Sequence, residues 1–151
     1  MSTRTMLFLV AGALGVLVIA LTRDDPPSAR QQALRDDAMA SYIPPGGTLV
    51  DTRSQNEGTS LGKPVAAVYA RMFELPRGTA ARALTHAAAA ARAAGWGPVA
   101  TSSAFPDVFN ADRTVRTGRI SLAVAIFRDA RVLPDDVEPP ALLVTLRHSG
   151  S

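Results

Sequence analysis

The stretch Arg119–Arg128, RISLAVAIFR, is the clearest β-strand signal in this chain. Alternate residues along it place Ile120, Leu122, Val124 and Ile126 on one side and smaller residues with Phe127 on the other. A continuous row of branched aliphatic side chains needs a covering layer. We therefore expect this strand to lie in a sheet, with its aliphatic face packed under a helix.

Four other segments carry weaker strand patterns: Thr48–Thr52, Val65–Glu74, Val99–Ser103 and Ala141–Arg147. Within the second of these, alternation predicts that a small apolar face faces the core; it consists of Ala66, Val68, Ala70 and Met72. The segments between the strands predict irregular structure. We expect a surface loop at 53–63, which could also serve as a binding loop, a long connection or hairpin tip at 104–118, and a proline-broken link at 129–140.

An alanine-rich helix is predicted over Ala80–Ala94, with a buried side formed by Leu84, Ala87, Ala88 and Ala91. Gly95 follows where a left-handed residue commonly ends a helix. Trp96 comes next and is expected to close the corner between helix and sheet. The alternative role for Trp96 is a stacking platform for a ligand.

Together these elements predict an α+β fold: a two-layer domain of a mostly antiparallel sheet, with one long Ala-rich helix on one face. Pro26 and Pro27 precede a further helix that Ser28 can cap, within SARQQALRDDAMASY. Its narrow apolar stripe favours packing on its own domain over lying on a membrane or a partner.

The N-terminal run Met6–Leu21, MLFLVAGALGVLVIAL, has no charged residue between Arg4 and Arg23. Arg4 through Arg23 gives 20 positions, close to the ~20 residues that a transmembrane helix needs. The run has no polar stripe, which argues against a buried core helix. A cleavable signal peptide is the main alternative, with Val18-Ile19-Ala20 as a tolerable cleavage site.

Charges flanking the run predict its orientation. The N-terminal flank holds only Arg4 and the α-amino group, whereas acids follow Arg23. By the positive-inside rule we expect a cytoplasmic N-terminus and an extracytoplasmic body. Ala11 and Gly15 are four positions apart and could support a weak homodimer of anchor helices. The expected organisation is a transmembrane anchor at 1–23, a stalk with a short helix at 24–43, an extracytoplasmic α+β domain at 44–148 and a tail at 149–151.

Composition excludes several classes of protein. The chain has no cysteine, which excludes a disulfide framework and a thiolate metal site. Its 16 basic and 13 acidic residues give a net charge of +3. The arginines are scattered, so we expect no nucleic-acid partner.

No catalytic or metal-binding motif is present in the sequence, and we predict no catalytic, cofactor-binding or metal site. His86 lies in the expected helix without a carboxylate one turn away. His148 directly follows the last expected strand, where the end of the chain is expected to fray. The acidic group Asp135, Asp136 and Glu138 could hold a cation, although adjacent acids in a loop usually remain solvated. Three further acids are isolated in the sequence and could meet only through the fold: Asp51, Asp107 and Asp112.

The layout resembles a broad group of small actinobacterial single-pass membrane-anchored proteins of unknown function. The matching pieces are the apolar run, Pro44-Pro45-Gly46-Gly47-Thr48-Leu49, and Ala93-Ala94-Gly95-Trp96 after an Ala-rich helix. The high content of alanine and arginine suits a GC-rich genome. The resemblance implies a location at the cell membrane and no particular activity.

Two classes of function remain. The first is a non-enzymatic interaction module at the cell envelope, which would bind a protein partner through a sheet face or the 53–63 and 104–118 segments. The second is an extracytoplasmic small-ligand sensor or hydrolase whose site is assembled from scattered Asp, Arg and Tyr residues. A deep pocket with convergent polar groups would favour the second class.

Overall fold

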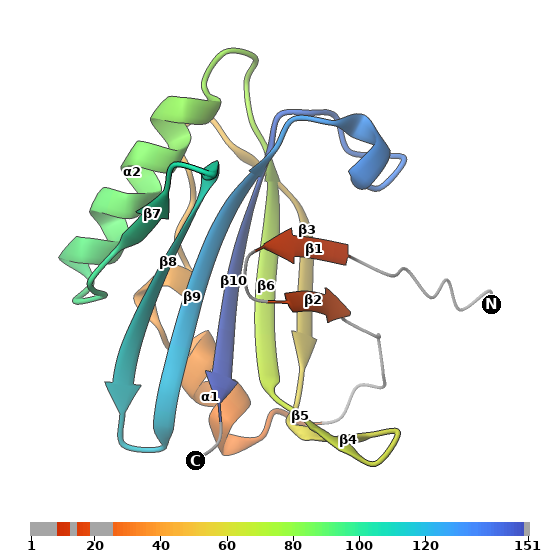
Figure 1. The fold of residues 1–151 in the computed structure, drawn as a ribbon, viewed down its shortest axis with the longest axis vertical. Helices are drawn as coiled ribbons and strands as arrows, with labels where there is room; N and C mark the ends of the chain where they lie inside the picture. Colours follow the sequence, from red (N-terminus) through yellow and green to blue (C-terminus); the bar gives the residue numbers. More distant parts are fainter. Residues whose placement is uncertain (1–8, 13–14, 19–25, 150–151) are drawn as a thin grey trace.

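The computed structural model describes residues 9–12, 15–18 and 26–149 (Figure 1). Its main body is a six-stranded antiparallel sheet in the order β3-β6-β10-β9-β8-β7. The strands are β3 Thr48–Gln55, β6 Ala67–Glu74, β7 Ala100–Ser102, β8 Phe105–Val115, β9 Gly118–Phe127 and β10 Ala141–Ser149. The expected α+β fold with a large antiparallel sheet is confirmed.

Helices cover one face of the sheet, which we call the helix face (Figure 1). α2 spans Ala80–Ala93, and the shorter α1 spans Ala29–Arg35 and is followed by the 3₁₀ turn η1, Ala38–Ala40. The helix-face core contains aliphatic residues of the two central strands and the small side of α2. The small residues that α2 buries are Ala80, Ala83, Ala87, Ala88 and Ala91.

Local capping agrees well with the sequence. The Ser28 hydroxyl accepts a hydrogen bond from the backbone N–H of Gln31 at 3.0 Å, as a helix N-cap does. Gly95 has φ +82°, and the N–H of Trp96 bonds the carbonyl of Ala91 at 3.0 Å. Trp96 is buried in the helix-face core, which confirms its predicted structural place. Leu34 of α1 is also fully buried there, so this helix packs on its own domain.

The predicted facing of the 65–74 strand is wrong. Ala67 and Phe73 of β6 point into the helix-face core, whereas Val68, Ala70 and Met72 lie on the opposite, second face. That second face is covered in part by Leu133 and Val137, from the link that carries the 3₁₀ turn η2, Ala130–Val132. Because the sheet is covered on both sides here, both faces of β6 carry buried apolar residues. The more uniformly apolar face is therefore not the one that packs under the helices.

Two segments expected to be irregular are largely strand. The 104–118 segment contains the 11-residue strand β8, which pairs with β9 from Val108 to Val115. The 53–63 segment contains the end of β3 and most of a small hairpin, β4 Gly58–Ser60 and β5 Lys63–Val65. Pairing with β9 overrides the polar composition of β8, and the end of β3 pairs with β6. β4 and β5 pair only with each other, in a two-stranded sheet of their own.

The expected transmembrane helix lies mostly on residues outside those described. Its described parts are two short strands, β1 Leu9–Gly12 and β2 Gly15–Val18, which pair antiparallel. Ala11 and Gly15 are therefore on different strands here, with Ala11 opposite Val16. Among the described residues, no helix has the length and apolar content needed to cross a bilayer.

Candidate functional site

A cavity of ≈ 330 Å³ opens on the second face between β3 and the 129–140 link. Its walls combine carboxylates, one guanidinium and apolar side chains; the lining residues are Val50, Asp51, Arg53, Pro134, Asp135, Asp136 and Val137. We call this space the acidic cavity. Its volume falls at the lower end of the ~300–1,000 Å³ range typical of small-molecule sites.

Two elements build the acidic cavity in different ways. β3 is an edge strand of the sheet, and it places Asp51 and Arg53 on the same side of the strand, two positions apart. The 129–140 link packs on the second face of the sheet through its buried residues Leu133 and Val137. Asp135 and Asp136 lie between these two buried residues and are exposed, so their carboxylates stand at the rim.

Charge in the acidic cavity is unbalanced. The Nε of Arg53 lies 2.7 Å from Oδ2 of Asp51, and the Arg53 side chain is only 9% exposed. This ion pair leaves Asp135 and Asp136 as surplus negative charge beside an apolar floor. Such a site is suited to a cationic group carried on an aliphatic stem, such as a lysine or arginine side chain.

Asp51, Asp107 and Asp112, which are isolated from one another in the sequence, are not brought together by the fold. Asp107 receives two bonds from Arg128, both at 2.8 Å, and this hydrogen bonding lowers the pKa of Asp107. Asp112 receives bonds from Arg119 at 2.5 Å and Ser121 at 2.8 Å, which likewise lower its pKa. Both pairs lie on the surface of the sheet and are partly exposed. Within the described part of the chain, no group of three His, Asp or Glu residues is placed to hold a metal ion.

His148 is wrongly placed by the sequence prediction, because β10 continues through it to Ser149. Its ring is fully buried, and Nε2 lies 2.8 Å from the hydroxyl of Thr117. Gly118, with φ +131°, passes so close that a Cβ there would lie 3.1 Å from Cε1 of the ring. Burial is the main cause of a lowered pKa at His148, and the charge of Arg30 adds to it.

His86 is exposed on α2 as expected, but it also has a partner. Its Nδ1 lies 2.9 Å from the hydroxyl of Tyr42. Burial raises the pKa of Tyr42 to about 12, so this phenol stays protonated, and the histidine tautomer decides which of the two groups donates the hydrogen bond. No sequence pattern predicted this contact, because the two residues are 44 positions apart.

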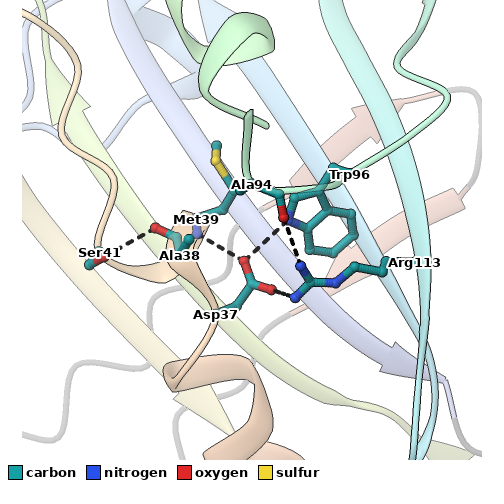
Figure 2. A network of polar contacts seen from close by, with 7 residues as sticks. All are labelled: Asp37, Ala38, Met39, Ser41, Ala94, Trp96 and Arg113. Atoms are coloured by element: carbon teal, nitrogen blue, oxygen red, sulfur yellow. Dashed lines mark hydrogen bonds and ion pairs between the residues drawn. The ribbon is translucent and has the colours of Figure 1, made fainter. Parts of the chain in front are cut away.

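A third polar cluster is centred on Asp37, which the sequence prediction also missed (Figure 2). Its Oδ1 accepts bonds from the N–H of Met39 at 2.8 Å and from Nε1 of Trp96 at 3.2 Å, and its other oxygen pairs with Arg113. Arg113 also donates to the carbonyl of Ala94 at 3.0 Å, and its guanidinium lies 4.8 Å from the Trp96 ring centroid.

The Asp37 cluster links three elements, namely η1, the end of α2 and β8. The Asp37 side chain has no exposed surface, and each of its oxygens accepts a hydrogen bond. A charge that is paired and bonded in this way fixes the relative placement of the elements around it. We therefore assign the Asp37 cluster a structural role and retain the acidic cavity as the candidate site. Comparisons with protein-family models, with curated proteins and with solved structures found no match to this chain.

Proposed function

We propose that this chain is a single-pass membrane protein whose α+β domain lies outside the cell membrane and binds a protein partner of the cell envelope. The observation that carries the interaction role is the acidic cavity, with Asp135 and Asp136 at its rim and an apolar floor. A basic side chain of the partner would enter it. This role requires no chemistry beyond charge and shape complementarity.

Support for the membrane anchor comes from the uncharged run between Arg4 and Arg23. A lipid bilayer offers no hydrogen-bond partners for the outer edges of a two-stranded hairpin, whereas a helix satisfies its own backbone groups. We therefore propose that the run is helical when it is in the membrane. Ala11 and Gly15 would then share one side of that helix and support a weak homodimer.

The second candidate is a small-ligand sensor, which the volume of the acidic cavity favours. A ligand with an ammonium or guanidinium group would bind there in place of the partner's side chain. The hydrolase alternative is less well supported, because the residues that line the cavity supply carboxylates, an already paired guanidinium and apolar groups. None of these lining residues is a hydroxyl or imidazole nucleophile.

Site-specific photocrosslinking in intact membranes tests the interaction role. A photoreactive residue replacing Val50, at the cavity wall, should give a discrete crosslinked product in cells. Asp135→Asn together with Asp136→Asn should reduce that product several-fold, because the partner's cation loses its counter-charges. The same photoreactive residue at Thr114, an exposed position on β8, serves as the control for random collisions.

The charge-matched control is Asp129→Asn together with Glu138→Gln, which removes two acids of the same link outside the cavity lining. It should leave the crosslink unchanged. Equal yields from both double variants would contradict a role for the acidic cavity. Saturable binding of free arginine to the purified chain, lost in Asp135→Asn/Asp136→Asn, would instead favour the small-ligand sensor.

A further inference from the structure

The tip of the β4–β5 hairpin carries a leucine in a place that folding alone does not explain. Leu61 is 100% exposed and has φ +51°, and Gly62 beside it has φ +76°. Ser60 and Lys63 pair directly across this two-residue turn. Positive φ at both central positions favours Asn-Gly or Gly-Gly, and a left-handed backbone is strained for leucine. Leu61 is therefore a fully exposed apolar side chain on a strained turn, which points to a contact with a surface outside this domain.

The base of this hairpin is hydrogen-bonded to residues 26–28, which follow the apolar run closely in the sequence. The amide of Asn56 donates to the carbonyl of Pro26 at 3.0 Å, and its oxygen accepts from the N–H of Ser28 at 2.9 Å. The hydroxyl of Ser28 donates to Glu57 at 2.5 Å, and this bond lowers the pKa of Glu57. Arg23 and Pro26 are three positions apart, a reach of about 10 Å at most. A membrane-embedded anchor would therefore hold the hairpin close to the lipid surface.

Charge on the domain is divided between the two ends of the sheet. The end near the hairpin and α1 is formed by the starts of β6 and β9 and the ends of β3, β8 and β10 (Figure 1). Its exposed or half-exposed bases outnumber its acids Asp36, Glu57 and Asp112 by three; they are Arg30, Arg35, Lys63, Arg116, Arg119 and Arg147.

The opposite end of the sheet has the reverse balance. Its bases are Arg77, Arg82, Arg128 and Arg131, against the six acids Glu74, Asp107, Asp129, Asp135, Asp136 and Glu138. A domain with its basic end beside the anchor is electrostatically suited to rest on anionic lipid headgroups. The acidic cavity, which opens on the second face, then lies nearer the end of the sheet that is away from the membrane.

We propose that the β4–β5 hairpin is a second membrane contact: Leu61 inserts at the boundary between headgroups and acyl chains, and Lys63 pairs with lipid phosphate. This contact rests on the proposed anchor, which brings the hairpin to the surface. The anchor and Leu61 together fix how the domain stands on the bilayer. A strong anchor combined with one weak interfacial contact gives an orientation that a single flexible tether does not.

Fluorescence of an environment-sensitive dye tests the contact in the full-length chain. The chain has no cysteine, so a single introduced cysteine is labelled specifically. Leu61→Cys is the test position, and Phe105→Cys is the matched control, because Phe105 is a 46% exposed apolar residue at the opposite end of the sheet. Ala13→Cys, inside the apolar run, reports on the anchor itself. All three are reconstituted in vesicles of phosphatidylcholine with phosphatidylglycerol.

We expect the dye emission to shift to the blue at positions 13 and 61, and lipid-borne quenchers to reduce both signals, with neither effect at position 105. A blue shift at 13 with a water-exposed dye at 61 would overturn the hairpin contact and leave the anchor intact. A water-exposed dye at 13 would overturn the anchor, and the contact with it. Equal shifts at 61 and 105 would also overturn the contact, because the domain would then adhere without orientation.

A second variant separates insertion from folding. Leu61→Asn suits the left-handed turn, so the fold should be retained and its thermal midpoint should not fall. A dye at Thr59→Cys in the same hairpin should show the blue shift with Leu61 present and lose it with Leu61→Asn. Retention of the shift in the Leu61→Asn chain would contradict insertion of the leucine. The shift should also weaken in vesicles of phosphatidylcholine alone, whose zwitterionic headgroups carry no net negative charge to attract Lys63, and at high salt, which screens that attraction.

Discussion

His148 illustrates how one buried side chain can couple folding to pH. Its ring lies against Gly118, and Nε2 contacts the Thr117 hydroxyl, so the neutral imidazole fits this place well. Arg30 of α1 and Glu57 of the β3–β4 link are the charged groups that act on it, and they have opposite effects on its pKa. Burial dominates, and the pKa lies below its ordinary value of 6.5.

The sign of the resulting pH effect follows from linkage. At a pH just below 6.5 the unfolded chain protonates His148 while the folded chain does not, so the unfolded state binds more protons. The free energy of unfolding should therefore fall as the pH is lowered from about 6.5 to the lower pKa of the folded state, and should be constant above that window as far as His148 is concerned.

Urea unfolding of the full-length chain in detergent, at several pH values from 7.5 downward, measures this effect. His148→Gln should flatten the dependence, because the titrating group is absent. His86→Gln keeps His148 and should retain the loss of stability on acidification. An unchanged pH dependence in His148→Gln would mean that the buried histidine does not titrate as proposed.

At the scale of elements, the strong periodic segments were predictable and the weakly patterned ones were not. β9 and α2 have a distinct apolar side, and their positions agree with the sequence. β8 carries Pro106, Asn110 and Asp112, which are typical of loops, but pairing with β9 and burial of Phe109 hold it extended. β10 reaches His148 because β6 and β9 provide partners on both sides, and this non-local cause leaves no local signal.

The candidate site was less predictable than the fold for the same reason. Asp135 and Asp136 were identifiable as an acidic cluster, yet their nearness to Arg53 depends on how the 129–140 link folds back over β3. The Asp37 cluster joins residues up to 76 positions apart. Contacts over such separations are a property of the completed sheet, and single-sequence periodicity contains no information about them.

The packing of β9 under α2 gives a direct test of the helix-face core. Val124 is fully buried there, and an aspartate in its place would be an unpaired charge in an apolar layer. We expect Val124→Asp to cost several kcal/mol of an unfolding free energy that is typically ~5–15 kcal/mol, enough to prevent accumulation of folded protein. Chemical denaturation followed by circular dichroism measures the loss.

The control for Val124→Asp is Thr114→Asp, an exposed position on the neighbouring strand β8. This change should alter the free energy of unfolding by no more than about 0.5 kcal/mol. A folded, stable Val124→Asp chain would contradict the assigned facing of β9, and with it the arrangement of the helix-face core.

For the molecule as a whole, the proposals combine into one arrangement. In the proposed arrangement the anchor would enter beside α1, and the basic end with Leu61 would rest on the headgroups. The acidic cavity would lie toward the other end of the sheet. Each feature alone would be common on a protein surface. Their order along one axis gives the molecule a membrane side and a partner side, which is what a tethered interaction module requires.

The side of the membrane on which the domain stands is the remaining expectation, and it depends on the flanks of the apolar run. Arg4 and the α-amino group favour a cytoplasmic N-terminus, so residues 24–151 should lie outside. Fusions after Ser151 to a reporter active only outside the cytoplasm, and to one active only inside it, should give signal from the first alone. Reversing the flank with Arg4→Glu should weaken that preference, because the positive charge that holds the N-terminus inside is then removed.

The mass of the mature chain must be read in the same cells, since loss of about 20 N-terminal residues would identify a cleaved signal peptide. Signal from the inner reporter alone would place the acidic cavity in the cytoplasm and redirect the search for its partner there.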